Sequence, residues 1–227
     1  MTRKLFGAVV LLACSLALVG GAYADTVSIG IQVGNGSIVN ETSSNTGLAT
    51  FGFPTSVTVG GFTIQSLVAS DDGSTPPDFT VNGGLESGGP GTLKIYVTDQ
   101  SIAATGPAVF DSAWGITQVP SGWTVTATTY VDSGNGLFTM TCATCTEVGT
   151  ATFNGNGSSN AESPVLSLTA PFSETQVLTF TATKSAASLT SIVGGADLSI
   201  VPAGEPSFFA LFALCLTSFA GRFRKRC

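Results

Sequence analysis

The sequence of 227 residues contains no histidine. Histidine is the commonest general acid or base in enzymes and the commonest side-chain ligand of transition metals. Its absence excludes Ser-His-Asp and Cys-His catalysis and every zinc site that needs an imidazole. The sequence also has no glycine-rich phosphate loop and no nucleophile elbow. A pair of carboxylates is one hydrolytic mechanism that works without histidine.

Charged residues are scarce and unevenly distributed. They make up 10% of the chain, against roughly 25% in an average protein. Between Asp25 and Glu205 lie all fourteen acidic residues but only two basic ones, Lys94 and Lys184, so this segment has a net charge of −12. So acidic a body is repelled by nucleic acid and by anionic membrane surfaces. We therefore expect no nucleic-acid partner.

The N-terminus has the layout of a secretory signal peptide. A basic start is followed by an apolar run over residues 5–19 and by a small-x-small cleavage site formed by Ala22 and Ala24. A lipoprotein site at Cys14 is the alternative, but the apolar run continues past that cysteine and the better cleavage site follows it. The sequence predicts a signal peptide over residues 1–24 and export of the rest.

The C-terminus contains a second apolar segment. Residues 207–221 form an uncharged run of 15 residues, about 22 Å long as a helix. A bilayer core is about 30 Å thick, but flanking arginines can snorkel and the bilayer can thin. A buried core helix is the alternative for a run of this length. This run is apolar on all sides, which favours the membrane. The basic cluster after it would stay in the cytoplasm by the positive-inside rule: Arg222, Arg224, Lys225 and Arg226.

A short motif precedes this apolar run and consists of Glu205, Pro206 and Ser207. Together with the apolar run and the basic end, it resembles the PEP-CTERM sorting signal of gram-negative bacteria that make extracellular polysaccharide. Gly204 stands where that signal has its first proline. The resemblance covers about 25 residues, and it implies an exosortase-like processing enzyme as a partner. It also implies a protein that is held in the membrane by residues 203–227 and is presented on the cell surface or released into the matrix.

The sequence predicts one all-β domain over residues 25–202. In residues 123–131, "WTVTATTYV", and 177–183, "VLTFTAT", apolar and threonine side chains alternate with the period of a half-buried strand. Similar runs occupy residues 26–33, 62–70 and 92–99. Turn dipeptides separate such runs: Asn35-Gly36, Asp72-Gly73, Asn82-Gly83-Gly84, Asn135-Gly136 and Asn154-Gly155. The pattern predicts roughly ten to twelve strands in a β-sandwich or a Greek-key barrel.

Cys142 and Cys145 form the most distinctive short motif of the body. A redox pair, half of a metal site and a local disulfide are the three interpretations of this spacing. The other three cysteines lie in the two terminal segments, so the exported body retains an even number in an oxidising compartment. Zinc would need four ligands, which the body does not supply. The sequence favours a disulfide.

The stretch "SDDGSTPPDF" brings Asp71, Asp72 and Asp78 close together in the sequence. Carboxylates on a turn can bind calcium, although Gly73 occupies a ligand position of the EF-hand pattern. An ordinary solvated turn is the favoured interpretation, and calcium is the one cofactor that the sequence leaves open.

Aromatic side chains give the remaining candidate site. Trp114, Trp123 and Tyr130 either pack in the core, which their strand pattern favours, or form a platform that stacks on sugar rings. The leading functional hypothesis is an exported, non-catalytic protein of the cell surface or the polysaccharide matrix. The alternatives are a carbohydrate-binding module and a carboxylate-dependent glycoside hydrolase.

Overall fold

The computed structural model describes residues 26–42, 47–52, 55–71, 79–103, 106–116, 119–185 and 192–202. The predicted signal peptide and the predicted sorting signal over residues 203–227 lie outside these ranges, as do Asp72 and Asp78. In the part of the chain that is described, no helix is long and apolar enough to cross a membrane.

The described residues form fourteen strands. These are β1 (Thr26–Val33), β2 (Val39–Thr42), β3 (Leu48–Phe51), β4 (Val57–Val59), β5 (Phe62–Asp71), β6 (Phe79–Ser87), β7 (Gly91–Ile102), β8 (Gly106–Ile116), β9 (Trp123–Asp132), β10 (Cys145–Phe153), β11 (Gly157–Glu162), β12 (Leu166–Leu168), β13 (Phe172–Ala182) and β14 (Ile192–Pro202). The excess over the roughly ten to twelve strands expected from such spacing comes from four short strands of three or four residues: β2, β3, β4 and β12.

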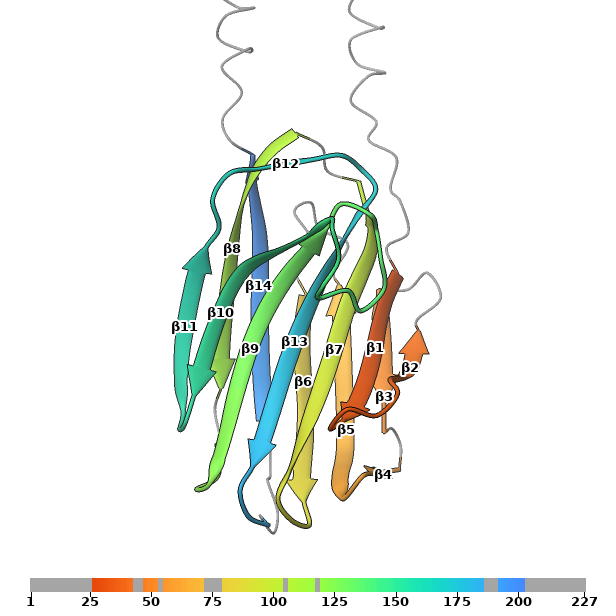
Figure 1. The fold of residues 1–227 in the computed structure, drawn as a ribbon, viewed down its shortest axis with the longest axis vertical. Coiled ribbons are helices and arrows are strands. Elements are labelled where there is room, and N and C mark those ends of the chain that lie inside the picture. The colour runs from red at the N-terminus through yellow and green to blue at the C-terminus, as the bar shows by residue number, and fades with distance from the viewer. Residues whose placement is uncertain are drawn as a thin grey trace, which may run out of the picture.

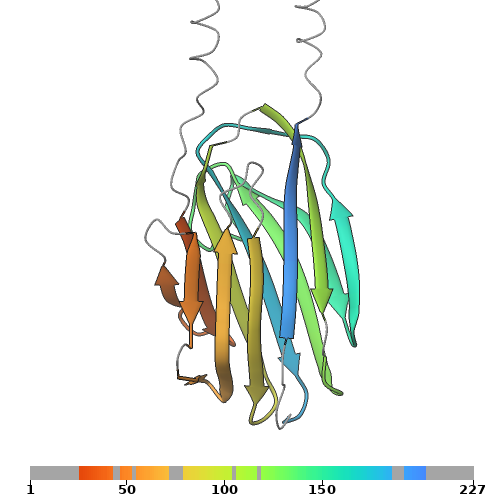
Figure 2. The same cartoon turned by 180° about the vertical axis from the view of Figure 1, so that it is seen from behind.

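The strands are arranged in two sheets that pack face to face, which is the predicted all-β sandwich (Figure 1). The front sheet has the order β10-β9-β13-β7-β1-β2, and the rear sheet has the order β11-β8-β14-β6-β5-β3, with β12 and β4 paired to β8 and β5. Figure 2 shows the rear sheet from its own side. Every pairing between described strands is antiparallel. Most sheet neighbours are far apart in sequence, so the chain crosses repeatedly between the layers.

The core lies between the two sheets, and the alternation in the sequence explains it. In β9 every second residue from Trp123 to Val131 is buried, and the threonines between them are partly exposed. Phe62 of the rear sheet packs edge-on against Trp123, with ring centroids 6.2 Å apart. Trp114 is 2% exposed, as is Trp123. Both tryptophans therefore belong to the core, which the strand pattern favoured.

One predicted turn is wrong. Asn82, Gly83 and Gly84 lie inside β6 and pair with β5, beside a register shift between Ile64 and Ser66. At Gly84 a Cβ atom would lie at an ordinary contact distance of 3.5 Å from the Cβ of Gln65, so the strand does not require a glycine there. The Asn-Gly-Gly run therefore continues a strand, and the extra residue of the bulged pair lies on β5 between Ile64 and Ser66.

The two ends of the described body lie at the same end of the sandwich. β1 begins and β14 ends at the top of Figure 1. The loop between β9 and β10, residues 133–144, lies at this end as well, in front of the six-stranded sheet. We call these residues the β9–β10 loop.

Candidate functional site

The outer face of the six-stranded sheet carries rows of hydroxyl groups. Register places Thr126 between Thr152 of β10 and Thr179 of β13. Neighbouring hydroxyls bond across the strands, at 3.3 Å for Thr126 and Thr152 and at 3.0 Å for Thr128 and Thr150. The rows comprise Thr124, Thr126 and Thr128 of β9, Thr150 and Thr152 of β10, and Thr179 and Thr181 of β13. Each hydroxyl both donates and accepts, so the face is a regular array of polar contacts.

The β9–β10 loop covers another part of the same outer face. Register places Tyr96, Thr98 and Thr175 on this face, and all three are at most 1% exposed. The loop backbone reaches down to them: the amide of Phe138 donates to Thr98 Oγ1 at 3.2 Å. Ser173 Oγ donates to the carbonyl of Gly136 at 2.7 Å. The loop is therefore packed on the sheet and shields it from solvent.

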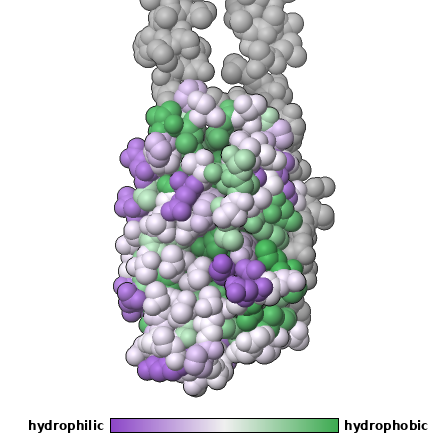
Figure 3. Space-filling model, in the orientation of Figure 1, coloured by the Kyte–Doolittle hydropathy of each residue, from purple (hydrophilic) through white to green (hydrophobic). Residues whose placement is uncertain are grey.

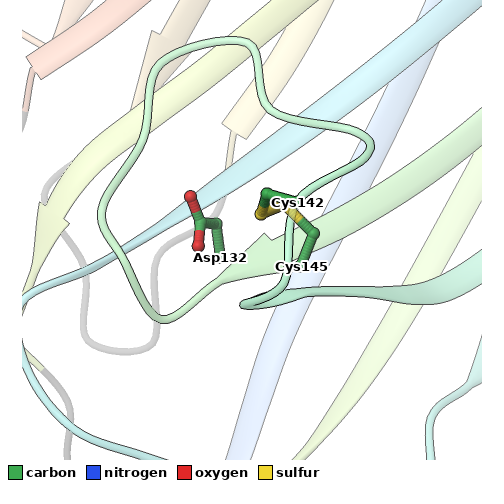
Figure 4. Close-up of side chains that lie close together, drawn as sticks. All are labelled: Asp132, Cys142 and Cys145. Atoms are coloured by element: carbon green, nitrogen blue, oxygen red, sulfur yellow. A yellow bond between two sulfur atoms is a disulfide. The ribbon is translucent and has the colours of Figure 1, made fainter.

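Asp132 anchors this loop from the end of β9 (Figure 4). Its Oδ1 accepts hydrogen bonds from the amide of Gly134 at 2.8 Å and from Thr144 Oγ1 at 2.6 Å. Its Oδ2 accepts from the amide of Gly136 at 3.0 Å and from Thr139 Oγ1 at 3.1 Å. Burial acts to raise the pKa of Asp132, but these four hydrogen bonds outweigh it and hold the pKa below its ordinary value. The carboxylate is thus charged and its oxygens are occupied.

A disulfide lies beside this carboxylate. Cys142 and Cys145 are bonded to each other, with Cα atoms 5.1 Å apart. Their sulfur atoms and a carboxylate oxygen of Asp132 lie within 4.8 Å of one another. Sulfurs in a disulfide are not thiolates and do not ligate metals as thiolates do, and the Asp132 oxygens already accept four hydrogen bonds. The cluster therefore serves to hold the loop rather than to bind a metal.

The loop presents apolar side chains beside the hydroxyl rows. The ring of Phe138 lies 5.8 Å from that of Tyr96, centroid to centroid. A Cβ at position 30 would lie 2.9 Å from Phe138 Cζ and 2.8 Å from Ile38 Cγ2, so Gly30 is required for both side chains to lie on β1. Leu137 is 37% exposed and Ile38 is 36% exposed. We call Ile38, Leu137 and Phe138 the apolar patch; hydrophobic residues gather over β1 and β2 in Figure 3.

Backbone strain concentrates at this loop. Three non-glycine residues of the described chain have positive φ: Ser101 at 72°, Asn135 at 56° and Phe138 at 54°. Asn135 Oδ1 accepts from the amide of Ser101 at 2.8 Å, so two of the three are bonded to each other. Asparagine tolerates this region, whereas an aromatic residue rarely adopts it. Strained backbone persists where surrounding contacts over-determine it and is commonest at functional sites. The sequence offered no signal for Phe138 beyond the preceding Asn-Gly turn.

Tyr130 is the one member of the predicted aromatic platform on the outer face. It is half-buried and lies opposite Glu147 of β10. Burial, and then the charge of Glu147, raise the pKa of its hydroxyl. Since both tryptophans are in the core, the platform as predicted does not exist. Tyr130 can contribute to the outer face only as a single, neutral side chain.

Two carboxylate pairs bear on the hydrolase hypothesis. Asp99 and Glu174 are directly opposite on β7 and β13, but both are 0% exposed and out of reach of a glycan. Asp111 and Glu162 are directly opposite on β8 and β11, with Glu162 exposed. Asp71, from the predicted calcium turn, lies at the end of β5, opposite Phe79. No described carboxylate pair lies on the outer face of the six-stranded sheet, where the loop and the apolar patch are.

Comparison with known proteins gives little further information. No family model matches the chain, and no curated protein matches it. Among solved structures, it is similar to the carbohydrate-binding module TmCBM61 in complex with beta-1,4-galactotriose, with 8% identity and a TM-score of 0.33 over 76% of this chain and 88% of that one. It is also similar to a carbohydrate-binding module of the β-sandwich superfamily, described as promiscuous in specificity, with 10% identity and a TM-score of 0.34 over 77% and 84% of the two chains. Likenesses at these scores carry no argument about function.

Proposed function

We propose that the chain is an exported, non-catalytic surface protein that binds polysaccharide through the outer face of its six-stranded sheet. The observation that carries the proposal is the apolar patch, to which the strained, disulfide-closed loop contributes Leu137 and Phe138, on the same face of the sheet as the rows of threonine hydroxyls. Exposed apolar groups that are held in place at some structural cost are a mark of interaction surfaces.

The chemistry of this face suits a sugar chain. A pyranose ring has an apolar face, which packs on aliphatic and aromatic side chains, and a rim of hydroxyls, which exchange hydrogen bonds with groups that both donate and accept. The apolar patch can pack on the ring face, and the threonine hydroxyls can exchange hydrogen bonds with the sugar hydroxyls. Residues 25–205 have a net charge of −12. A strongly anionic polysaccharide would be repelled, so the proposal is for a neutral one.

We also place the protein outside the cytoplasm, held by its predicted C-terminal membrane segment. The support is the sequence: a signal peptide at one end and a PEP-CTERM-like signal at the other, with Glu205 and Pro206 before the apolar run. An exosortase-like enzyme is the proposed processing partner. The described body begins and ends at one end of the sandwich, so a tether there leaves most of the outer face accessible.

The test is binding of neutral exopolysaccharide from the producing cells, measured by affinity electrophoresis and by pull-down. The double variant Ile38→Ser/Leu137→Ser removes exposed apolar groups from the patch. We expect it to bind about tenfold more weakly, the effect of losing roughly 1.4 kcal/mol of apolar contact. Val165→Ser is the matched control, because Val165 is 59% exposed and lies between β11 and β12. Equal retention of both variants, or no retention of the wild type by any neutral polysaccharide, would refute the proposal.

A further inference from the structure

Two residues in the interior of the sandwich carry polar groups that have no partner. Thr129 of β9 and Gln176 of β13 are directly opposite each other, and each is 1% exposed. Within the part of the chain that the structure describes, the hydroxyl of Thr129 and both polar atoms of the Gln176 amide have no hydrogen-bond partner. Native proteins satisfy nearly all buried polar groups, so two neighbouring exceptions need an explanation.

The neighbouring strands offer neither side chain another polar partner. On its other side Thr129 is opposite Gly149 of β10, which has no side chain. Gln176 is opposite Val97 of β7, which is part of the apolar core. Among directly opposite positions, each of the two side chains therefore has only the other as a polar neighbour. The pair consists of a nucleophilic hydroxyl and an acyl carbon that carries a leaving group.

The surroundings of the pair are closely packed and contain a carboxylate. A Cβ atom on Gly149 would lie 2.7 Å from Trp114 Cη2, so a side chain of the rear sheet fills the interior beside Thr129. Glu174 shares the inward face of β13 with Gln176, and it is diagonal to Thr129 across the pair of β9 and β13. Diagonal neighbours on one face lie within reach of a long side chain. The interior therefore places a base within reach of the hydroxyl.

We propose that Thr129 and Gln176 react with each other and form an ester that cross-links β9 and β13. Thr129 Oγ1 attacks Cδ of Gln176 while the carboxylate of Glu174 takes the hydroxyl proton. The tetrahedral centre then breaks its bond to Nε2, which leaves as ammonia with the proton that Glu174 held. The reaction consumes one hydroxyl and one primary amide, and it yields one ester and one ammonia. It needs no oxidant and no second substrate.

Strand pairing and burial both favour this reaction. Directly opposite residues have Cβ atoms about 4.5–5.5 Å apart, and the chain of atoms Cβ–Oγ1–Cδ–Cγ–Cβ in the ester reaches about 5 Å. The paired strands hold the two groups at a high effective concentration. The ester has no hydrogen-bond donor, so its formation removes the buried O–H and N–H groups that lack acceptors. Water is excluded from the interior, which protects the ester from hydrolysis.

The intact mass of the purified exported protein, with its two ends determined by peptide sequencing, tests the cross-link. After reduction of the disulfide between Cys142 and Cys145, we expect the wild type to be lighter than its sequence by the mass of one ammonia. Thr129→Val and Gln176→Met each remove one reactant and should have the masses of their sequences. Thr146→Val changes an exposed threonine of β10 in the same way and should keep the loss. A wild-type mass equal to that of its sequence would overturn the proposal, even if neither of the two reactant variants folds.

Fragmentation distinguishes this ester from a succinimide, which an Asn-Gly sequence such as Asn135-Gly136 forms with the same loss of ammonia. Peptides from β9 and β13 should be joined to each other, and mild alkali should separate them by adding one water and leaving a carboxylate on residue 176. A loss of ammonia that is located at an asparagine, or that Thr129→Val retains, would contradict the cross-link. Glu174→Gln should give mostly unreacted chain, and complete reaction in this variant would refute the role of Glu174 as the base.

Discussion

Asp132 offers the sharpest test of how the loop is held. Replacing it with asparagine keeps the size of the side chain but puts an NH2 group where one carboxylate oxygen was. Each oxygen accepts from one backbone amide and one hydroxyl: Gly134 and Thr144 at one, Gly136 and Thr139 at the other. Whichever way the new amide is turned, one backbone N–H then faces a donor. The threonine hydroxyl beside it can rotate and accept instead.

The expected loss of stability follows from the number of hydrogen bonds that change. Hydrogen bonds to a charged group contribute about 1.5–3 kcal/mol each, but Gly134 and Thr144 are exposed, so water can replace part of what is lost. One amide loses its acceptor and the retained bonds become neutral. We expect Asp132→Asn to lower the free energy of unfolding by about 2 kcal/mol, within the range known for the loss of a partner from a buried hydrogen-bond network.

Urea denaturation measures this loss. With a slope of about 2.5 kcal/mol per molar urea, the midpoint should fall by about 0.8 M, and hydrogen exchange at Gly134 and Gly136 should become faster. Asp111→Asn is the control: it makes the same chemical change on β8, opposite Glu162, and should stay within about 0.5 kcal/mol of the wild type. A midpoint for Asp132→Asn within about 0.2 M of the wild type, with unchanged exchange at both glycines, would refute the assigned role.

Two further predictions concern the pH dependence of stability and the C-terminal apolar run. Because the folded state holds the pKa of Asp132 below its ordinary value, its contribution to stability is complete above an unfolded pKa of about 3.9 and is lost as pH falls through the lower folded value. Urea midpoints between pH 7 and pH 2.5 should therefore fall more steeply below pH 4 for the wild type than for Asp132→Asn, and parallel curves would contradict this. If the C-terminal run spans the membrane, replacing Arg222, Arg224, Lys225 and Arg226 with glutamine should release more intact precursor from cells, and an unchanged membrane fraction would count against the anchor.

Much of the fold follows from period-two alternation. β1, β7 and β9 lie where residues 26–33, 92–99 and 123–131 alternate. The same alternation places Trp123 in the core. It fails along β13, where Phe172 to Leu178 are all buried. The outward side chains there are covered by the β9–β10 loop, which contacts Ser173 from 37 residues away. The alternation within one strand does not indicate whether a loop that is distant in the sequence covers the outer face of that strand.

The loop itself was only partly predictable. The sequence Asp132 to Gly136 indicated a tight hairpin, and Asn135 does adopt a positive φ. Instead the chain continues for twelve residues before β10. Within this loop Thr139 and Thr144, which are 7 and 12 residues after Asp132, donate hydrogen bonds to its carboxylate. These hydrogen bonds form only when the loop is closed, so they leave no periodic pattern in the sequence. The disulfide between Cys142 and Cys145 could be predicted from the sequence, because the two cysteines are only three residues apart.

Two neighbouring residues of β7, Thr98 and Asp99, lie on opposite faces of the six-stranded sheet. Thr98 faces outward, where it accepts from the amide of Phe138 and bonds with Thr175. Asp99 faces inward, opposite Glu174. Because successive side chains of a strand point to opposite faces, a substitution at one of these positions need not disturb the chemistry at the other. A variant at Thr98 therefore tests the outer face without altering the buried residues of the core.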